Sequence, residues 1–260
     1  MRESDSFDGL VARIEDLCAV ADRGELGISA FLSPREAHLA SAYLARNAQN
    51  FLAFGGYGDA ERKRIYVLPD YIERDGDIGR VCEYGFSLEI SALEILPSGY
   101  RKLSHRDYLG SILALGIERA VVGDIVVDED GRAIVFCDST MESFICNELV
   151  RVANDKVKVS KIALECVAVP PRRVAPISDT VASERIDCVV GALCSLSRER
   201  AKELVLAGLV EMDYEVEDRP DWAVSDGALI SVRGYGKFRV ISLCDVTRKG
   251  RHRLVAEKFL

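Results

Sequence analysis

The sequence predicts an α+β protein made of an N-terminal α/β segment, a central ferredoxin-like domain and a compact C-terminal module. Three patterns support this prediction: a helix-rich start followed by strands, alternating strands and helices in the middle, and two short helices followed by strands at the end. Apolar residues make up 48% of 260 residues, which is enough for more than one core. We expect domains at residues 1–76, 77–169 and 181–260, with a linker at 170–180 and a basic tail.

The N-terminal segment begins with an amphipathic helix. Apolar residues follow the spacing of one helix face from Phe7 to Ala21. Ser33 and Glu36 form a capping box with Pro34 at the first helical position, so a second helix starts there. Two strand-like stretches follow, at residues 50–54 and 64–68.

The middle third shows the element order βαββαβ of a ferredoxin-like sandwich. The predicted strands are residues 88–96, 124–127, 133–137 and 157–164, and the predicted helices are 104–116 and 139–153 with Phe144 on an apolar face. The same order would allow an RRM-like domain, in which aromatic residues on inner strands stack RNA bases. Only Phe136 is available for that role in its strand, and core packing is the favoured interpretation for it.

A proline-rich stretch is expected to connect the middle domain to the C-terminal module. Beyond it, Ser183 is expected to cap one short helix and Ser197 a second one, which Gly208 ends. Strand-like segments follow at residues 210–216, 229–232 and 238–243.

The charge is unevenly distributed. The net charge of −8 excludes a uniformly basic nucleic-acid coat, but residues 233–258 hold eight basic and two acidic side chains, a local net charge of +6. No apolar run approaches the roughly 18 residues that a membrane helix needs. Charged residues in the first helix argue against a signal peptide, so we expect a cytoplasmic protein.

Cysteine and histidine usage indicates neither disulfides nor a metal site. The eight cysteines include no C-x-x-C pair and several lie among apolar residues, which is typical of buried reduced thiols. The three histidines are far apart in the sequence. We therefore expect no structural zinc and no cofactor.

The start of the predicted helix after Ser197 could bind phosphate. Arg198 and Lys202 are four residues apart and share its outer face, near the positive end of the helix dipole. The alternative is an ordinary solvated helix face, because Glu199 and Glu203 lie between and beside these cations.

A Gly-x-Gly turn near the C-terminus carries cations and aromatics in alternation. Arg233, Lys237 and Arg239 flank Tyr235 and Phe238, which are expected to be exposed. Such a mixture suits a nucleotide strand, through phosphate pairing and base stacking. The alternative is a hairpin with a basic rim. Further cations follow at Arg248, Lys249, Arg251 and Arg253.

A second phosphate site is possible in the middle domain. Arg101, Lys102, His105 and Arg106 lie around a predicted helix start, and we expect no acidic group beside them. His105 could act as a base with Asp107, but neither a nucleophile nor a metal partner accompanies it, so we do not expect catalysis.

Motifs in three parts of the chain resemble a known family. Residues 185–187, 196–198, 207–210 and 226–234 resemble the S4 domain, a small RNA-binding module. The stretches 231–238 and 247–251, with blocks at 54–69 and 103–125, resemble the YlmH family of bacterial S4-domain proteins. This resemblance covers nearly the whole chain in colinear order.

The resemblance implies a non-catalytic, cytoplasmic RNA-binding protein that acts on the ribosome, with links to quality control of stalled large subunits carrying peptidyl-tRNA and to cell division. The implied partners are ribosomal RNA and/or tRNA on the large subunit, with no membrane, and we expect a monomer. Matching positions imply RNA contacts at Arg185, Ser197, Arg198, Lys202, Arg233, Lys237 and Arg239. Because the helix start and the turn are adjacent in an S4-like module, their cations are expected to form one surface. The chain departs from the family's usual basic strand at Glu211, Asp213, Glu215 and Glu217.

Two alternatives stay open. One is an RNA-modifying enzyme that uses an S4 domain as an anchor, as pseudouridine synthases and tyrosyl-tRNA synthetases do. Against it, the chain has no Gly-rich nucleotide loop before a helix, and Asp187 resembles a synthase motif only superficially. The other is a cell-division adaptor that docks through its acidic first half.

Overall fold

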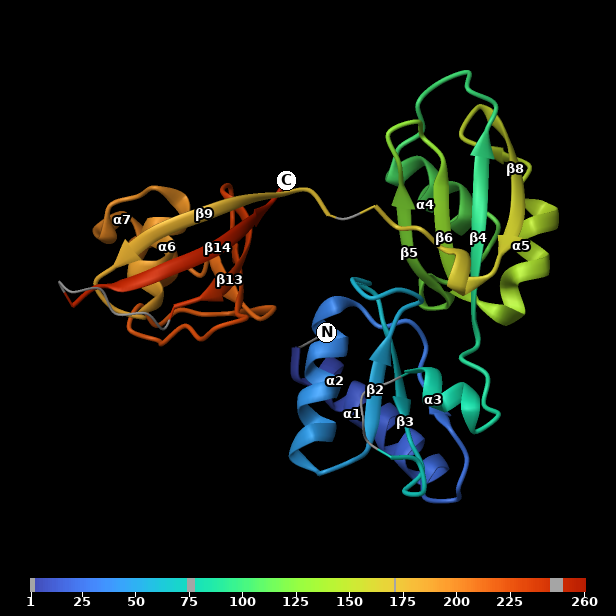
Figure 1. Cartoon of the computed structure of the whole chain (residues 1–260), viewed down its shortest axis with the longest axis horizontal. Coiled ribbons are helices and arrows are strands. Elements are labelled where there is room, and N and C mark those ends of the chain that lie inside the picture. The colour runs from blue at the N-terminus through green and yellow to red at the C-terminus, as the bar shows by residue number, and fades with distance from the viewer. Residues whose placement is uncertain (1–2, 74–77, 171, 244–249) are drawn as a thin grey trace. The chain divides into compact units, whose positions relative to one another are not determined.

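The computed structural model describes residues 3–73, 78–170, 172–243 and 250–260 (Figure 1). The chain divides into two compact units, residues 1–170 and 171–260. Three antiparallel sheets with accompanying helices give the α+β class that the sequence predicts. The first two expected domains lie in one unit, and a boundary between residues 76 and 77 stays a prediction.

The N-terminal part of the first unit is a three-stranded sheet with two helices packed against it. Its elements are α1 (Glu3–Ala21), β1 (Gly27–Ile28), α2 (Pro34–Arg46), β2 (Phe51–Phe54) and β3 (Arg64–Val67). The predicted capping box is present, because Ser33 and Glu36 each accept a hydrogen bond from the other's backbone N–H. Leu10 and Leu44 lie in the core that the helices share with Ile65 of the central strand.

The rest of the first unit is a five-stranded sheet with the order β5-β6-β4-β8-β7. Its strands are β4 (Ile90–Pro97), β5 (Val122–Val127), β6 (Ala133–Asp138), β7 (Arg151–Val152) and β8 (Asp155–Ile162). The helices are α3 (Ile78–Glu83), α4 (His105–Leu113) and α5 (Glu142–Glu148), with 3-10 turns η1 (Arg119–Val121), η2 (Ser139–Met141) and η3 (Leu164–Cys166). The chain therefore contains the expected βαββαβ order, with the short β7 in addition.

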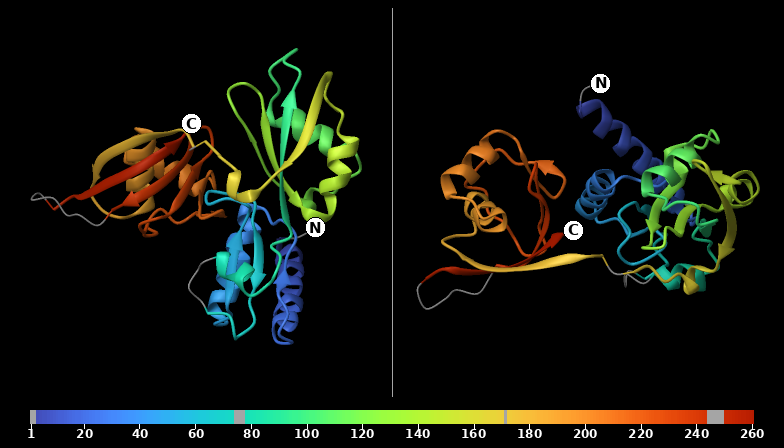
Figure 2. Two further views of the ribbon diagram at one scale, coloured as in Figure 1. Left: turned by 45° about the vertical axis from the view of Figure 1, so that its right-hand side comes forward. Right: turned by 90° about the horizontal axis from the view of Figure 1, so that it is seen from above.

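The two faces of this sheet belong to different cores. Leu93 and Val135 lie in the core on the side of α4 and α5, which Figure 2 shows along one side of the sheet. Ala92 and Phe136 lie in a second core, together with Tyr66 of the N-terminal part. Both faces of the middle sheet thus contribute to the interior of the first unit.

The predicted helix at residues 139–153 is wrong in its length. A 3-10 turn comes first, α5 is seven residues long, and the chain then turns into β7. Val152 is buried and pairs with Asp155, which requires the backbone to leave the helix near Leu149. Ile145, expected on the same apolar face, is buried, but Phe144 is 43% exposed, so its expected place in the core was wrong.

The second unit is a six-stranded antiparallel sheet with the order β11-β10-β12-β13-β14-β9. The strands are β9 (Val174–Val181), β10 (Val210–Met212), β11 (Glu215–Val216), β12 (Leu229–Val232), β13 (Gly236–Ser242) and β14 (His252–Phe259). Helices α6 (Ile186–Cys194) and α7 (Arg198–Leu206) share one core with a single face of this sheet (Figure 2). Ile186, Val189, Val190 and Leu193 are buried there, as predicted.

The expected linker at 170–180 and the expected basic tail are corrected by the structure. Residues 174–181 form the edge strand β9, which pairs along its whole length with β14. Pro176 is tolerated because a proline can occupy an edge strand without breaking a central ladder. The tail contributes β14, whose Leu254 and Ala256 are buried in the core of the second unit.

Two further expectations in the second unit were wrong. Ser183 does not cap α6; the N-cap position is Arg185, and the Ser183 hydroxyl lies 3.4 Å from the Cys188 sulfur. The strand expected at 210–216 is a tight hairpin of β10 and β11. Asp213 and Tyr214 form its turn with positive φ values of 50° and 71°, which break the strand.

Candidate nucleic-acid interface

The start of α7 presents two cations as the sequence predicts. The Ser197 hydroxyl accepts a hydrogen bond from the Arg200 N–H at 3.2 Å, which fixes the first turn. Ala201, Leu204 and Val205 are buried, so the opposite face of the helix carries Arg198 and Lys202 to the surface. This places both cations close to the positive end of the helix dipole.

A buried carboxylate organises the arginines beside this helix. Asp187, in the first turn of α6, is 1% exposed. It accepts two hydrogen bonds from Arg185, both at 3.1 Å, and one from Arg198 Nε at 3.2 Å. One acidic group therefore holds two guanidinium groups at the junction of α6 and α7, while Arg198 remains 59% exposed.

The ionised form of Asp187 is the stable one. Burial raises the pKa of its carboxyl, but hydrogen bonds from Arg185, Cys188 and Arg198 and the charge of Arg198 outweigh burial, so the pKa lies below its usual value. In the sequence, residues 185–187 resemble the S4 domain and, superficially, a synthase motif, and the positioning role of Asp187 was missed. The usable signal was an arginine two residues before an aspartate at a helix start.

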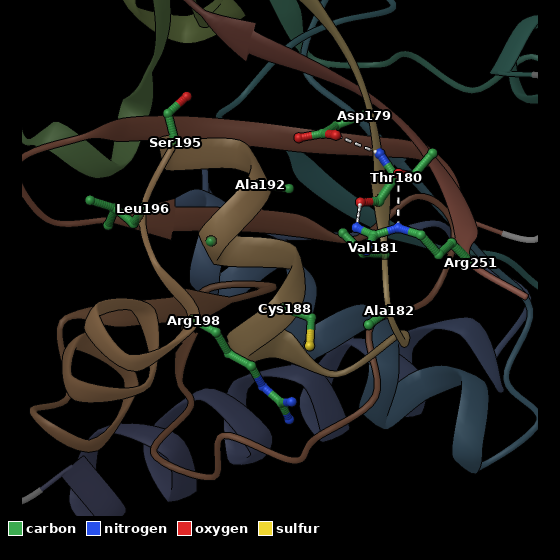
Figure 3. A pocket seen from close by; sticks show the side chains of 11 residues that line it. Asp179, Thr180, Val181, Ala182, Cys188, Ala192, Ser195, Leu196, Arg198 and Arg251 are labelled. Atoms are coloured by element: carbon green, nitrogen blue, oxygen red, sulfur yellow. Dashed lines mark hydrogen bonds between the residues drawn. The ribbon is translucent and has the colours of Figure 1, made fainter. Parts of the chain in front are cut away.

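A pocket of about 400 Å³ lies between α6 and the end of β9. Figure 3 shows its lining, with Arg198 on the helix side and Arg251 on the strand side. The Arg251 guanidinium is held by the carbonyl and the hydroxyl of Thr180. Two cations therefore border the pocket, and Asp179 is its only acidic lining residue among those the structure describes. This balance favours an anionic ligand.

The Gly-x-Gly turn between β12 and β13 differs in part from its prediction. Arg233 is exposed at the turn, and Tyr235 is half-buried against the core. Phe238, expected to be exposed, is only 1% exposed. It pairs with Ile230 on the face that packs against α6 and α7, so strand alternation forces it inward.

The predicted single surface of five cations is not formed. Lys237 pairs with Ser231, and Arg239 with Leu229, so strand alternation places both on the sheet face opposite α6 and α7. There the Lys237 ammonium lies 5.0 Å from the Tyr214 ring, and the Arg239 guanidinium lies 5.7 Å from the Phe259 ring. Arg198 and Lys202 lie on the helix side. Arg248 and Lys249 fall outside the described residues.

The possible second site around α4 differs from its prediction as well. Arg101 forms a 2.6 Å ion pair with Asp107, so the expected absence of acidic neighbours was wrong. Burial and the charge of Arg119 lower the pKa of His105, which favours its neutral form. Lys102 and Arg106 are exposed. Only these last two remain available as simple phosphate contacts.

Phe136 is a core residue, as the favoured interpretation held. It is 0% exposed, and its ring centroid lies 5.0 Å from that of Tyr57 at 24°. A Cβ added to Gly56 would lie only 2.3 Å from the Phe136 ring, so the 55–58 loop packs directly on this sheet face. The aromatic position that an RRM would use for stacking is therefore closed.

Two of the family-like blocks contact each other in the first unit. The backbone N–H groups of Glu61 and Arg62 donate to the Asp124 carboxylate at 2.7 and 3.0 Å. The Arg62 guanidinium donates to the carbonyl oxygens of Phe31 and Val122. These motif residues hold the N-terminal part against the middle sheet rather than forming an exposed site.

Known proteins resemble this chain in sequence and in fold. Residues 83–166 match the family described as "Putative RNA-binding domain in YlmH". A protein of Bacillus subtilis (strain 168), named "Ribosome-associated protein quality control protein P2", is 28% identical over 239 residues, which cover 92% of this chain and 90% of that protein. In residues 83–166 the chain is similar to the YlmH family.

A solved structure supports the fold of the chain. It is titled "Cell division protein ylmH from Streptococcus pneumoniae" and matches with a TM-score of 0.50 at 24% identity. The match covers 65% of this chain and 96% of the solved chain.

The family match covers the middle sheet of the first unit. Residues 83–166 run from the end of α3 to η3, so α6, α7 and their pocket lie outside the matched range. Within the parts of the chain that the structure describes, no helix is both long and apolar enough to cross a membrane.

Proposed function

We propose that this protein is a non-catalytic, cytoplasmic RNA-binding protein that associates with the ribosome. It contacts ribosomal RNA and/or peptidyl-tRNA on the large subunit and serves ribosome quality control or translation. The observation that carries the proposal is the pair of arginines fixed by Asp187 at the α6–α7 junction. Its support is the similarity to a ribosome-associated quality control protein over 92% of the chain.

In this proposal the C-terminal unit is an S4-type domain and the middle sheet is ferredoxin-like. Two short helices on one face of a small curled sheet support the first assignment. The strand order β5-β6-β4-β8 supports the second, because it interleaves the two halves of a βαββαβ unit.

The chemistry at the α6–α7 junction suits an RNA backbone. The Arg198 side chain is 59% exposed while Asp187 fixes its direction, so a phosphate meets an oriented donor. The first turn of α7 adds free N–H groups and the helix dipole. Arg251 provides a further cation across the pocket.

The direct test is co-sedimentation of the full-length protein with purified large ribosomal subunits over a range of KCl concentrations. Arg198→Ala is expected to weaken binding and to reduce the slope of log K against log salt by roughly 0.7–0.9, the value for one lost phosphate contact. Glu215→Ala, an exposed residue of β11, is the control and should bind like the parent. Parent protein that stays in the supernatant at 50 mM KCl would refute the proposal.

A nuclease step separates this function from the adaptor alternative. If the protein binds through RNA, digesting the RNA of the large subunit should release it. Retention on nuclease-treated particles would instead favour a protein–protein adaptor. Mass spectrometry of the bound RNA before and after incubation would detect a modification and so reveal an enzyme.

A further inference from the structure

The β7–β8 hairpin carries like charges in an unfavourable arrangement. Arg151 lies directly opposite Lys156 in the antiparallel ladder, where like charges destabilise a sheet. Lys158 follows two residues later on the same face. All three side chains are exposed, and none has an ion-pair partner in the part of the chain that the structure describes.

These cations lie on the sheet face that is turned away from α4 and α5. Lys158 pairs with Leu96, and Ile162, four residues further along β8, pairs with Ala92 of the second core. Val157 and Val159, which point the other way, pack against the helix-side core. The Phe136–Tyr57 stack closes the inner part of the cationic face, whereas Leu96 is 38% exposed.

An exposed aromatic residue lies on the loop beside this hairpin. The Ser98 N–H donates to the Lys156 carbonyl at 2.9 Å, and the Ser98 hydroxyl bonds to the buried Asp155 carboxylate. This pairing ties the loop after β4 to the start of β8. Two residues further on, Tyr100 is 83% exposed, the largest exposed fraction among the large hydrophobic side chains that the structure describes.

We propose that the β7–β8 hairpin and the Tyr100 loop form a second RNA contact, specific for single-stranded RNA. Phosphates pair with Arg151, Lys156 and Lys158, and a base stacks on the Tyr100 ring. The class of ligand rests on the proposed RNA-binding function, and the surface adds which part of the middle sheet takes part. An RRM uses the centre of its sheet; this contact uses the open end of the same face.

A protective role of the lysines is the competing explanation. Charged side chains on an edge strand prevent pairing with other chains, and most of β8 lies at the sheet edge. That role explains Lys158 alone. It does not explain why Arg151 pairs with Lys156 across the ladder, nor why Tyr100 on the adjoining loop is exposed.

The test measures binding of a fluorescent 12-nucleotide oligouridine to the full-length protein by anisotropy at several KCl concentrations. Lys156→Gln/Lys158→Gln should weaken binding about tenfold at 50 mM KCl and reduce the salt slope by roughly 1.4. Tyr100→Leu should weaken binding at least about fivefold, while Tyr100→Phe retains it, because stacking needs a ring and not a hydroxyl. Arg151→Thr should weaken binding while leaving the melting temperature unchanged or higher.

The matched control is Arg23→Gln/Arg46→Gln, which removes two exposed charges from the N-terminal part of the same unit. It should bind oligouridine within twofold of the parent. The inference is overturned if the β8 double variant binds like this control, or if the parent fails to bind oligouridine at 50 mM KCl. Either result leaves the large-subunit experiment, and with it the proposed function, to be decided separately.

Discussion

At the residue scale, one carboxylate in the C-terminal unit positions two arginines and offsets only part of their combined positive charge. Asp187 is buried, and both Arg185 and Arg198 donate to it. The arginines keep a net positive charge together and lose conformational freedom. Binding of a phosphate to these arginines therefore costs less conformational entropy than binding to an arginine side chain that is free to move.

The first prediction separates orientation from charge. Asp187→Asn makes the unit more positive by one charge, so a purely electrostatic account expects tighter RNA binding. We expect weaker binding to large ribosomal subunits, because Arg198 loses its anchor. Co-sedimentation of parent and variant at about 150 mM KCl decides between the two, and tighter binding by the variant would contradict a positioning role.

The second prediction concerns pH. The pKa of Asp187 lies below its unfolded value near 3.9, so its contribution to stability is present above that value and is lost as pH falls through the folded pKa. The parent should be more stable than Asp187→Asn at pH 7, and the difference should shrink toward pH 3. Urea unfolding at both pH values measures it; a constant difference would contradict the predicted linkage.

The third prediction concerns two phenylalanines. Phe136→Ala should lower the free energy of unfolding by about 3–5 kcal/mol, because it empties a packed site between the 55–58 loop and β6. Phe144→Ala, at a 43% exposed position, is the control and should change it by well under about 1 kcal/mol. RNA affinity of folded Phe136→Ala protein should match the parent, and a loss of affinity without a loss of stability would indicate base stacking.

At the element scale, strands that form apolar runs could be predicted from the sequence, and a strand rich in polar residues could not. β2, β3, β4 and β6 lie close to their predicted positions because apolar residues recur in them. Most of β9 lies in the stretch predicted to be a linker, because Pro176 and several polar residues hide an edge strand. Its partner strand β14 lies more than 70 residues further along the sequence. A partner that distant leaves no local signal.

The fourth prediction tests β9 as part of the C-terminal unit. A fragment of residues 172–260 should unfold cooperatively, whereas a fragment of 182–260 should not. The shorter fragment loses all eight pairs with β14, and Leu254 and Ala256 lose the strand that covers their edge. Thermal melting followed by circular dichroism measures the difference. Equal melting temperatures of the two fragments would contradict this prediction and favour a linker at these residues.

At the scale of the whole molecule, the sequence predicted which residue types the candidate site contains better than it predicted where these residues lie. Arg198, Lys202 and Arg233 are exposed, as expected of surface cations at α7 and at the β12–β13 turn. Their division between two sheet faces was not, because it depends on register, and a shift of one residue exchanges the faces. The Asp187 cluster was missed although an arginine two residues before an aspartate at a helix start was a usable signal. The β7–β8 hairpin was missed because its cross-strand pairs depend on register.

The fifth prediction applies to the intact chain. Its affinity for large ribosomal subunits should fall linearly in log K against log salt, although the net charge is −8. Local cations displace counterions from the phosphates, and at 0.15 M salt the field of exposed charges more than about 8 Å away is largely screened. A flat plot would exclude an electrostatic contact with RNA.

The shared core of the first unit has a practical consequence for dissecting this protein. A segment cut to the family-matched residues 83–166 would lack Tyr57, Tyr66 and Phe31, and would present Ala92, Ile134 and Phe136 to water. Such a fragment would self-associate and would bind other macromolecules non-specifically through its exposed apolar surface. Binding measured on the excised segment would therefore describe a surface that the intact protein never exposes.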